Sequence, residues 1–284
     1  MDCNPVRWWR RVQFENRSAG FALLIVLWTL VLVAFLVLHL TTGGHTEMRI
    51  ATNLESNAVV MAAADGAISA AIFNLTAPQP DERWPTNGVP HELTIGNCWV
   101  EVRLENEAAR INPNLASPAL LEALARVVGT DPRSARLIAQ AIADWVGSSP
   151  TPTPPDTLRA QYQSAGLDYA PPGAPLASMD ELTRVLGVSP ELYSALRPHL
   201  TLYGPPEPEP GGTDPVVAAA VAETPRAVQA QIPGAPVPPD TLTVRIIATA
   251  TGLGNARLSR TAIVRVSSSL PQGYAVLAWR NTIE

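Results

Sequence analysis

The chain has 284 residues, of which 46% are apolar and only 6% aromatic, and its formal net charge is −5 with no lysine among its basic residues. This length can hold one or two domains with real cores, and the acidic balance argues against a general nucleic-acid binder. The two cysteines, Cys3 and Cys98, are too few for a disulfide framework or a cysteine zinc site.

The first predicted element is an apolar helix from Phe21 to Leu40, a run without any formal charge. As a helix it spans about 30 Å, which matches the hydrocarbon thickness of a bilayer. Four arginines precede it, Arg7, Arg10, Arg11 and Arg17. This bias predicts a single membrane span with the N-terminus in the cytoplasm and the rest of the chain outside. A cleaved secretory signal and a plain signal anchor are the alternatives.

The helix is predicted to continue beyond the membrane. No proline occurs before Pro78, and apolar residues recur three and four positions apart, at Ile50, Leu54, Ala58, Met61, Ala64, Ile68 and Ile72. This spacing is typical of an amphipathic helix. The sequence therefore predicts one N-terminal helix over residues 21–76, apolar within the membrane (21–40), amphipathic after it, and softened where Gly43 and Gly44 join the two parts.

A charged leader that ends in glycine, followed at once by phenylalanine and such a helix, resembles the type IV pilin and pseudopilin family. The resemblance implies that residues 1–20 are a prepilin leader, that a prepilin peptidase cuts between Gly20 and Phe21, and that Phe21 becomes N-methylated. Most members carry a glutamate as the fifth mature residue, whereas this chain has Ile25 there. A lone carboxylate in hydrocarbon costs at least ~2–3 kcal/mol. A subunit with no neighbour ahead of it has no amino terminus to compensate that cost.

Strand-like segments appear in two separate places. The first is HELTIGNCWVEVRLEN, with a turn at IGN, and the second is a hairpin around Gly252 to Asn255. The segment YAVLAWR near the C-terminus predicts a last strand. We therefore expect an α+β fold in which an antiparallel, pilin-like β-sheet, formed by residues 77–109 and 236–284, is interrupted by an inserted domain.

The insertion, residues 110–235, is predicted to be α-helical with loops rich in proline and glycine. Three helix starts place a capping residue before a proline, at Ser117-Pro118, Asp131-Pro132 and Ser189-Pro190. A fourth start is the capping box from Ser178 to Glu181. Apolar residues after each start lie at helical spacing.

Four segments of the chain are, in this order, similar to the minor pseudopilin K family of the type II secretion system: RINPNLASPALLEAL, AIADWVG, GAPLASMDELTRVLGVSPELYSALRPHLTLYG and YAVLAWR. This family also lacks the membrane glutamate. The resemblance implies a non-enzymatic protein of the inner membrane, with periplasmic C-terminal domains, that sits at the tip of the pseudopilus and helps to start its assembly. The implied partners are the other minor pseudopilins, the major pseudopilin, the prepilin peptidase and the inner-membrane assembly platform, together with secreted cargo or the outer-membrane secretin.

The chain departs from its relatives at two positions. After the tryptophan of ADWVGSSPTPTPPD only Asp144 and the distant Asp156 remain, where many relatives carry closely spaced acids. The calcium that the resemblance implies is therefore in doubt, and we assign no metal site and no cofactor. The stretch GGTDPVVAAAV stands where a second helix-starting motif with an asparagine is expected.

Two other functions fit the sequence less well. The insertion also resembles helix-hairpin-helix modules, so a membrane-anchored DNA-binding protein is the alternative. Its hairpins would be Gly129-Thr130 and Gly187-Val188, without the Gly-x-Gly pattern, and seven arginines face eight acids from Arg110 to Leu202. No motif of a nucleophilic or dinucleotide-dependent enzyme is present, and the four histidines are too scattered to indicate a metal site.

Overall fold

A computed structural model of the chain describes residues 19–209, 212–224 and 241–282. The chain divides into two compact units, residues 1–56 and residues 57–284. Helix α1 (Ala19–Leu75) supplies the described part of the first unit and enters the second. Most of the predicted leader, with its four arginines, lies outside the described residues, as does the end of the predicted insertion from residue 225 onwards.

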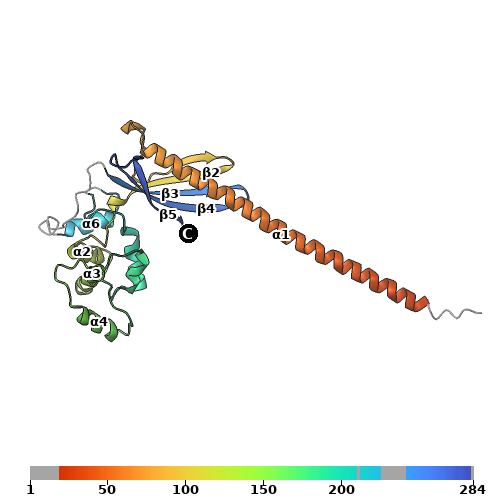
Figure 1. The fold of residues 1–284 in the computed structure, drawn as a ribbon, viewed down its shortest axis with the longest axis horizontal. Coiled ribbons are helices and arrows are strands. Elements are labelled where there is room, and N and C mark those ends of the chain that lie inside the picture. The colour runs from red at the N-terminus through yellow and green to blue at the C-terminus, as the bar shows by residue number, and fades with distance from the viewer. Residues whose placement is uncertain (1–18, 210–211, 225–240, 283–284) are drawn as a thin grey trace, which may run out of the picture. The chain divides into compact units, whose positions relative to one another are not determined.

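The sheet of the second unit has five antiparallel strands in the order β1-β2-β3-β4-β5 (Figure 1). The strands are β1 (His91–Ile95), β2 (Cys98–Asn106), β3 (Leu242–Thr251), β4 (Arg257–Val266) and β5 (Tyr274–Thr282). Both predicted hairpins and the final strand are thus confirmed. Strands β2 and β3 are direct neighbours, with Trp99 opposite Thr251 and Asn106 opposite Val244.

The second half of helix α1 packs against one face of this sheet. Its buried side chains recur at helical spacing and are mostly small: Val60, Ala63, Ala64, Ala67, Ile68, Ala71, Ile72 and Leu75. They meet small residues of the sheet, among them Ala248, Ala250 and Ala262. Small side chains on both surfaces let a helix approach a sheet closely. The predicted apolar stripe is therefore correct in its period over Ala64, Ile68 and Ile72.

The described residues cover only the second part of the predicted stripe. Ile50, Leu54 and Ala58 are exposed, because the described sheet residues cover the helix only from Val60 onwards. Gly43 and Gly44, expected to soften the helix, lie inside α1 in the structure. Glycine lowers helix propensity by only about 1 kcal/mol per residue, which a long helix tolerates.

Between β2 and β3 the described residues form short helices: η2 (Glu107–Ala109), α2 (Pro118–Val127), α3 (Pro132–Val146), α4 (Pro155–Ser164), η3 (Met179–Arg184), α5 (Pro190–Leu196), η4 (Arg197–His199) and α6 (Pro215–Glu223), with η denoting 3-10 helices. All four predicted helix starts are present. Ser117, Asp131 and Ser189 each accept a backbone N–H bond as N-caps. The capping box at Ser178 is complete, but it opens a 3-10 helix rather than an α-helix.

Two α-helices lie outside the four predicted helix starts. Helix α4 follows Pro154, which offers no capping side chain, and only Tyr162 on it is buried, so its apolar signal is weak. Helix α6 lies in the stretch GGTDPVVAAAV, where Asp214 caps the backbone N–H groups of Val216 and Val217. The aspartate thus supplies the cap that was expected from an asparagine.

The helices share a hydrophobic core of their own. Leu124 on α2 and Ile142 on α3 lie within it, together with Trp145, Tyr162 and Leu182. Helix α3 ends at Gly147, whose φ of 74° is left-handed, and a Cβ at this residue would lie 2.7 Å from the carbonyl oxygen of Gly173. Glycine therefore meets both the conformational and the steric demand there.

A buried carboxylate connects the sheet to the helical segment. Glu107 has an exposed fraction of 0%. Its Oε1 accepts hydrogen bonds from Arg245 Nε of β3 at 2.6 Å and from Arg110 Nη1 at 3.3 Å. Its Oε2 accepts a bond from the hydroxyl of Thr201. One side chain thus binds β3 of the sheet and two separate parts of the helical segment, at Arg110 and at Thr201.

Backbone contacts reinforce this junction. Ile111 N donates to His199 O at 3.0 Å, and Thr201 N donates to Ile111 O at 2.9 Å. A Cβ on Gly204 would lie 2.9 Å from the carbonyl oxygen of Glu107, which is too close for a real side chain. Only glycine therefore fits at this position without a shift of the backbone. Burial lowers the pKa of the Arg245 guanidinium, an effect that the neighbouring Glu107 charge opposes.

Replacing Leu124 or Ile142 by aspartate should unfold the helical segment, because either change buries a carboxylate in an apolar core at a cost of more than about 4 kcal/mol. Limited proteolysis is the measurement: the helical segment should become sensitive while the sheet strands stay resistant. Leu137→Asp on the exposed face of α3 is the control and should change stability by less than about 0.5 kcal/mol. If the helical segment of the Leu124 and Ile142 variants resisted proteolysis as well as the wild type does, these two side chains would not lie in its core.

Glu107→Gln should lower the free energy of unfolding by about 3–5 kcal/mol, because it leaves Arg245 half-buried without its counter-charge. The control is Glu101→Gln, which breaks the exposed pair with Arg103 on β2 and should cost about 0–1 kcal/mol. Denaturant unfolding of both variants provides the comparison. Equal losses of the free energy of unfolding in the two variants would show that the buried carboxylate of Glu107 contributes no more to stability than the exposed one of Glu101.

Candidate functional site

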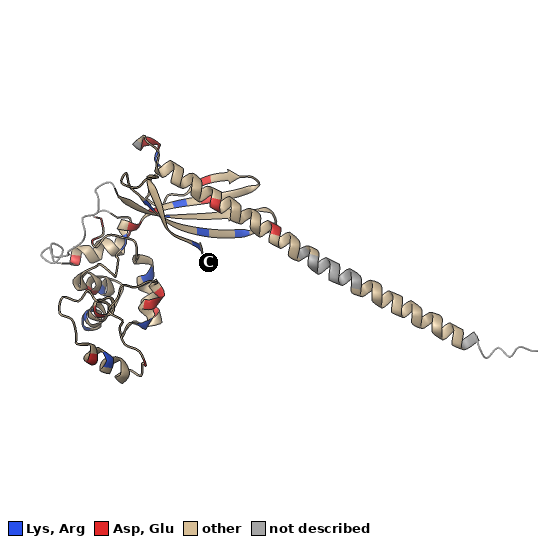
Figure 2. Ribbon diagram, viewed as in Figure 1, with Lys and Arg blue, Asp and Glu red and all other residues tan. Residues whose placement is uncertain are grey.

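The apolar start of helix α1 fits a membrane segment. The segment Phe21–His39 is long and apolar enough to cross a bilayer, and none of it is buried in the structure. Figure 2 shows no charged residue along this part of the helix. Phe21 and Ile25 both expose their side chains, by 70% and 49%. Gly20 lies in the first turn of α1, so the predicted cleavage position is a helix start; whether it is cut stays a prediction.

A second segment of α1, Ile50–Leu75, also has the length and composition of a membrane span, but 44% of it is buried. Its buried residues form the stripe against the sheet described above. Burial against a sheet is what the core helix of a water-soluble domain shows. The part of this segment from Val60 to Leu75 therefore belongs to the core of the second unit.

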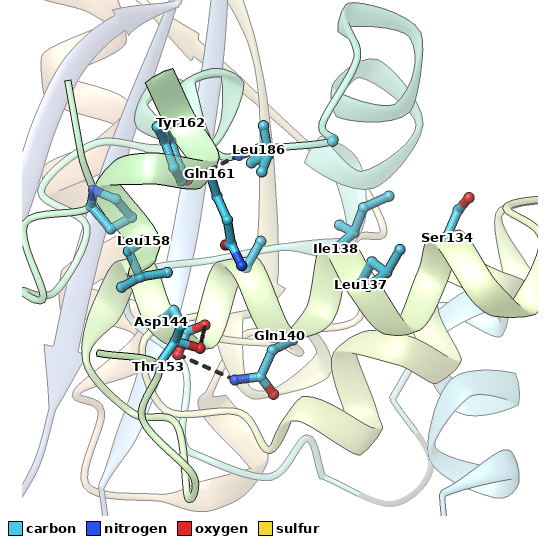
Figure 3. A pocket seen from close by; sticks show the side chains of 13 residues that line it. Ser134, Leu137, Ile138, Gln140, Asp144, Thr153, Leu158, Gln161, Tyr162 and Leu186 are labelled. Carbon is cyan, nitrogen blue, oxygen red and sulfur yellow. Dashed lines mark hydrogen bonds between the residues drawn. The ribbon is translucent and has the colours of Figure 1, made fainter. Parts of the chain in front are cut away.

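The helical segment contains a hollow of about 370 Å³ between α3, α4 and the turn after η3 (Figure 3). Aliphatic side chains form much of its wall, namely Leu137, Ile138, Leu158 and Leu186. The polar lining comes from Ser134, Gln140, Asp144, Thr153, Gln161 and Tyr162. The hollow is thus apolar along its sides with a few polar groups, the composition of many ligand sites.

Asp144 is the acid of this hollow, and only 8% of its surface is exposed. Its Oδ1 accepts a hydrogen bond from Gln140 Nε2 at 3.2 Å, and its Oδ2 accepts one from Thr153 Oγ1 at 3.0 Å (Figure 3). The same Gln140 nitrogen donates to Ser149 Oγ at 2.7 Å. Neutral donors therefore hold the carboxylate in place.

Tyr162 closes one side of the hollow. Its hydroxyl oxygen accepts a hydrogen bond from the backbone N–H of Leu186 at 3.0 Å, which ties α4 to the turn after η3. Its ring contacts those of Trp145 and Tyr169, with centroid distances of 6.3 and 5.7 Å. Burial raises the pKa of the Tyr162 hydroxyl, so the group stays protonated and neutral.

The residues around Asp144 do not fit a calcium site. Ca²⁺ takes six to eight oxygen ligands, whereas this position offers one carboxylate and its two neutral neighbours. Asp156, the other acid of this stretch, is exposed on α4. Within residues 19–209, 212–224 and 241–282, no three side chains of His, Cys, Asp or Glu come together as metal ligands.

The other residues singled out in the sequence occupy ordinary structural positions. His199 Nδ1 lies 2.6 Å from Asp214 Oδ2 and so joins η4 to the cap of α6. Gly129 and Gly187 both have positive φ, at 103° and 88°, as chain turns after helical segments require. No feature of the described residues favours the DNA-binding alternative.

Sequence reasoning singled out Asp144 but missed its hydrogen-bonding partners and the junction at Glu107. Gln140 lies one helical turn before Asp144, a spacing at which polar pairs on a helix commonly meet, so the sequence did carry a signal for it. Thr153 and Glu107 lie in segments without any pattern that predicts their contacts.

Comparison with known proteins agrees with these features. Residues 100–206 match the family model described as "Type II secretion system (T2SS), protein K". No curated protein sequence matches the chain.

Among solved structures, the fold is similar to a chain of the crystal structure of the GspK-GspI-GspJ complex from the type 2 secretion system of enterotoxigenic Escherichia coli. The TM-score is 0.52 at 16% sequence identity, over 84% of this chain and 99% of that chain. At this identity the likeness concerns the fold alone. Residues 100–206 are thus similar to the type II secretion system protein K family, and the fold of the chain is similar to that of a chain in the GspK-GspI-GspJ complex.

Proposed function

We propose that the protein is a structural subunit at the tip of the periplasmic pseudopilus, where it helps to start pseudopilus assembly for protein export. The observation that carries this proposal is the match of residues 100–206 to secretion protein K in a chain whose N-terminal helix can cross a membrane. We propose no catalytic role.

The proposed location is the inner membrane, with one span, a cytoplasmic N-terminus and periplasmic C-terminal domains. The unburied apolar segment Phe21–His39 supports the span, and the burial of Ile50–Leu75 against the sheet supports there being no second one in α1. The arginines before Phe21 support the orientation.

The proposed maturation step is cleavage by the prepilin peptidase between Gly20 and Phe21, followed by methylation of the new amino terminus at Phe21. The glycine at the end of a basic segment, directly before a membrane helix, supports this step. The mature chain would then begin with the apolar helix itself.

The proposed tip position follows from two features. Ile25 replaces the acid that would pair with a neighbour ahead in the fibre, so the chain needs no such neighbour. The helices between β2 and β3 also add bulk to the pilin-like sheet, and a bulky insertion crowning the fibre would hinder further stacking beyond it. We propose the division into leader, helix, split sheet and insertion at residues 110–235 on the same grounds.

The proposed partners are the other minor pseudopilins, the major pseudopilin, the prepilin peptidase and the inner-membrane assembly platform, with secreted cargo or the outer-membrane secretin as further contacts. The similar solved chain comes from a complex with GspI and GspJ, which supports the first of these. No nucleic acid is among the proposed partners.

Gly20→Leu should block cleavage of the leader, because a side chain at the peptidase subsite obstructs an enzyme that must approach bare backbone. The matched control is Ala22→Leu, which adds the same side chain two residues later and should be processed normally. Intact mass and N-terminal sequencing of membrane-extracted protein measure the outcome. A Gly20→Leu protein that still begins at Phe21 would refute pilin-type processing.

Ile25→Glu should place an acid in the span at a cost of about 2–3 kcal/mol unless a neighbouring amino terminus pairs with it. The variant should therefore insert poorly, or occupy positions along the fibre rather than only at its tip. Leu24→Glu carries the same cost one residue away and should impair insertion without adding copies, while Ile25→Leu should leave secretion unchanged. The measurements are secretion and the number of copies per pseudopilus. One Ile25→Glu copy per fibre with normal secretion would show that the missing acid does not set the tip position.

A further inference from the structure

The hollow in the helical segment carries a negative charge that no described cation balances. Asp144 lines it and is more than nine-tenths buried. Its hydrogen-bond donors, Gln140 and Thr153, are neutral, and it forms no ion pair with any residue that the structure describes. Glu107, the other buried acid described above, differs from Asp144 because it forms ion pairs with two arginines, Arg110 and Arg245.

The carboxylate retains capacity for further donors. An ionised carboxylate offers about four lone-pair sites, and the two neutral donors occupy one site on each oxygen of Asp144. Charge-assisted hydrogen bonds from an ammonium or guanidinium group are roughly twice as strong as neutral ones. A cation entering the hollow would therefore gain an interaction that the neutral neighbours do not supply.

The shape of the hollow selects among cations. Leu137, Ile138, Leu158 and Leu186 line its walls, so a small hydrated ion would find apolar surface where it needs ligands (Figure 3). A cation carried on an aliphatic stem matches both parts, with the stem along the leucines and the charge at Asp144.

The surroundings of the hollow favour a side chain that belongs to a polypeptide over a free amine. Leu137 exposes 64% of its surface and offers apolar contact to a ligand larger than a single amine. Gln161 also lines the hollow, is exposed, and its side-chain amide makes no hydrogen bond with the described residues. Such an amide can pair with the backbone of a bound peptide.

We propose that this hollow binds the side chain of an arginine or lysine presented by a partner polypeptide, with Asp144 as the counter-charge and the aliphatic wall of α3 and α4 holding the stem. The site lies in the helical segment and does not depend on where the protein sits in a pseudopilus. It would give this segment a charge-selective contact for a second protein.

The test is isothermal titration calorimetry on the full chain in detergent, with an acetylated and amidated Ala-Arg-Ala peptide as the probe. The comparison peptide carries citrulline, which keeps the shape of arginine but not its charge. The arginine peptide should bind saturably and about tenfold more tightly, the ratio that roughly one charge-assisted hydrogen bond supplies. Equal dissociation constants for the two peptides would overturn the proposal.

Variants locate the site. Asp144→Asn should weaken binding of the arginine peptide about tenfold or more, whereas Asp156→Asn, the same change at the exposed acid of α4, should leave it unchanged. Gln161→Glu adds a second carboxylate to the lining without disturbing the core and should tighten binding; this variant keeps the test decisive if Asp144→Asn misfolds. Unaltered affinity in folded Asp144→Asn, or no gain in Gln161→Glu, would refute the assignment. An Asp144-dependent response to calcium chloride in place of the peptide would assign the hollow to a metal ion instead.

Discussion

The architecture of the second unit depends on one buried carboxylate. Glu107 follows directly after β2, where the chain leaves the sheet, and it binds Arg245 of β3, Arg110 and Thr201. Strands β2 and β3 are paired neighbours, so a segment inserted between them must leave and return at one place. Burying this charge is costly, and the two guanidinium groups with the hydroxyl offset that cost only when all of them are in position. The charge therefore fixes the point at which the helices join the sheet.

This arrangement separates two hydrophobic cores. The stripe of α1 and one face of the sheet form the first, and the helices between β2 and β3 form the second around Leu124 and Trp145. Each core follows its own pattern, since the first needs small residues for close helix–sheet contact and the second needs branched and aromatic ones. Because a polar junction joins them, the helical segment can carry its own hollow and binding surface without changing the sheet.

Local signals explain what the sequence could predict. The N-caps at Ser117, Asp131 and Ser189 lie within three residues of their partners. The hairpins could be predicted from the alternation of apolar and polar residues and from the turn residues between the strands. Glu107 could not be predicted in this way, because Thr201 and Arg245 lie 94 and 138 residues further along the chain. The same holds for the hollow, which depends on how α3, α4 and the turn after η3 meet. The sequence singled out Asp144 only as one of two acids that remain after the tryptophan, and its contacts could be known only from its neighbours in space.

In the exposed part of the α1 stripe, the apolar spacing of the sequence continues over residues that the sheet of this chain does not cover. An amphipathic spacing indicates that residues need cover and is silent about which molecule supplies it. From Val60 onwards the sheet of the same chain supplies it, whereas Ile50 and Leu54 remain 54% and 64% exposed. Exposed apolar residues on a helix gain free energy only when another surface covers them. The sequence therefore marks the whole stripe, whereas the sheet of this chain accounts for the cover of its second part only.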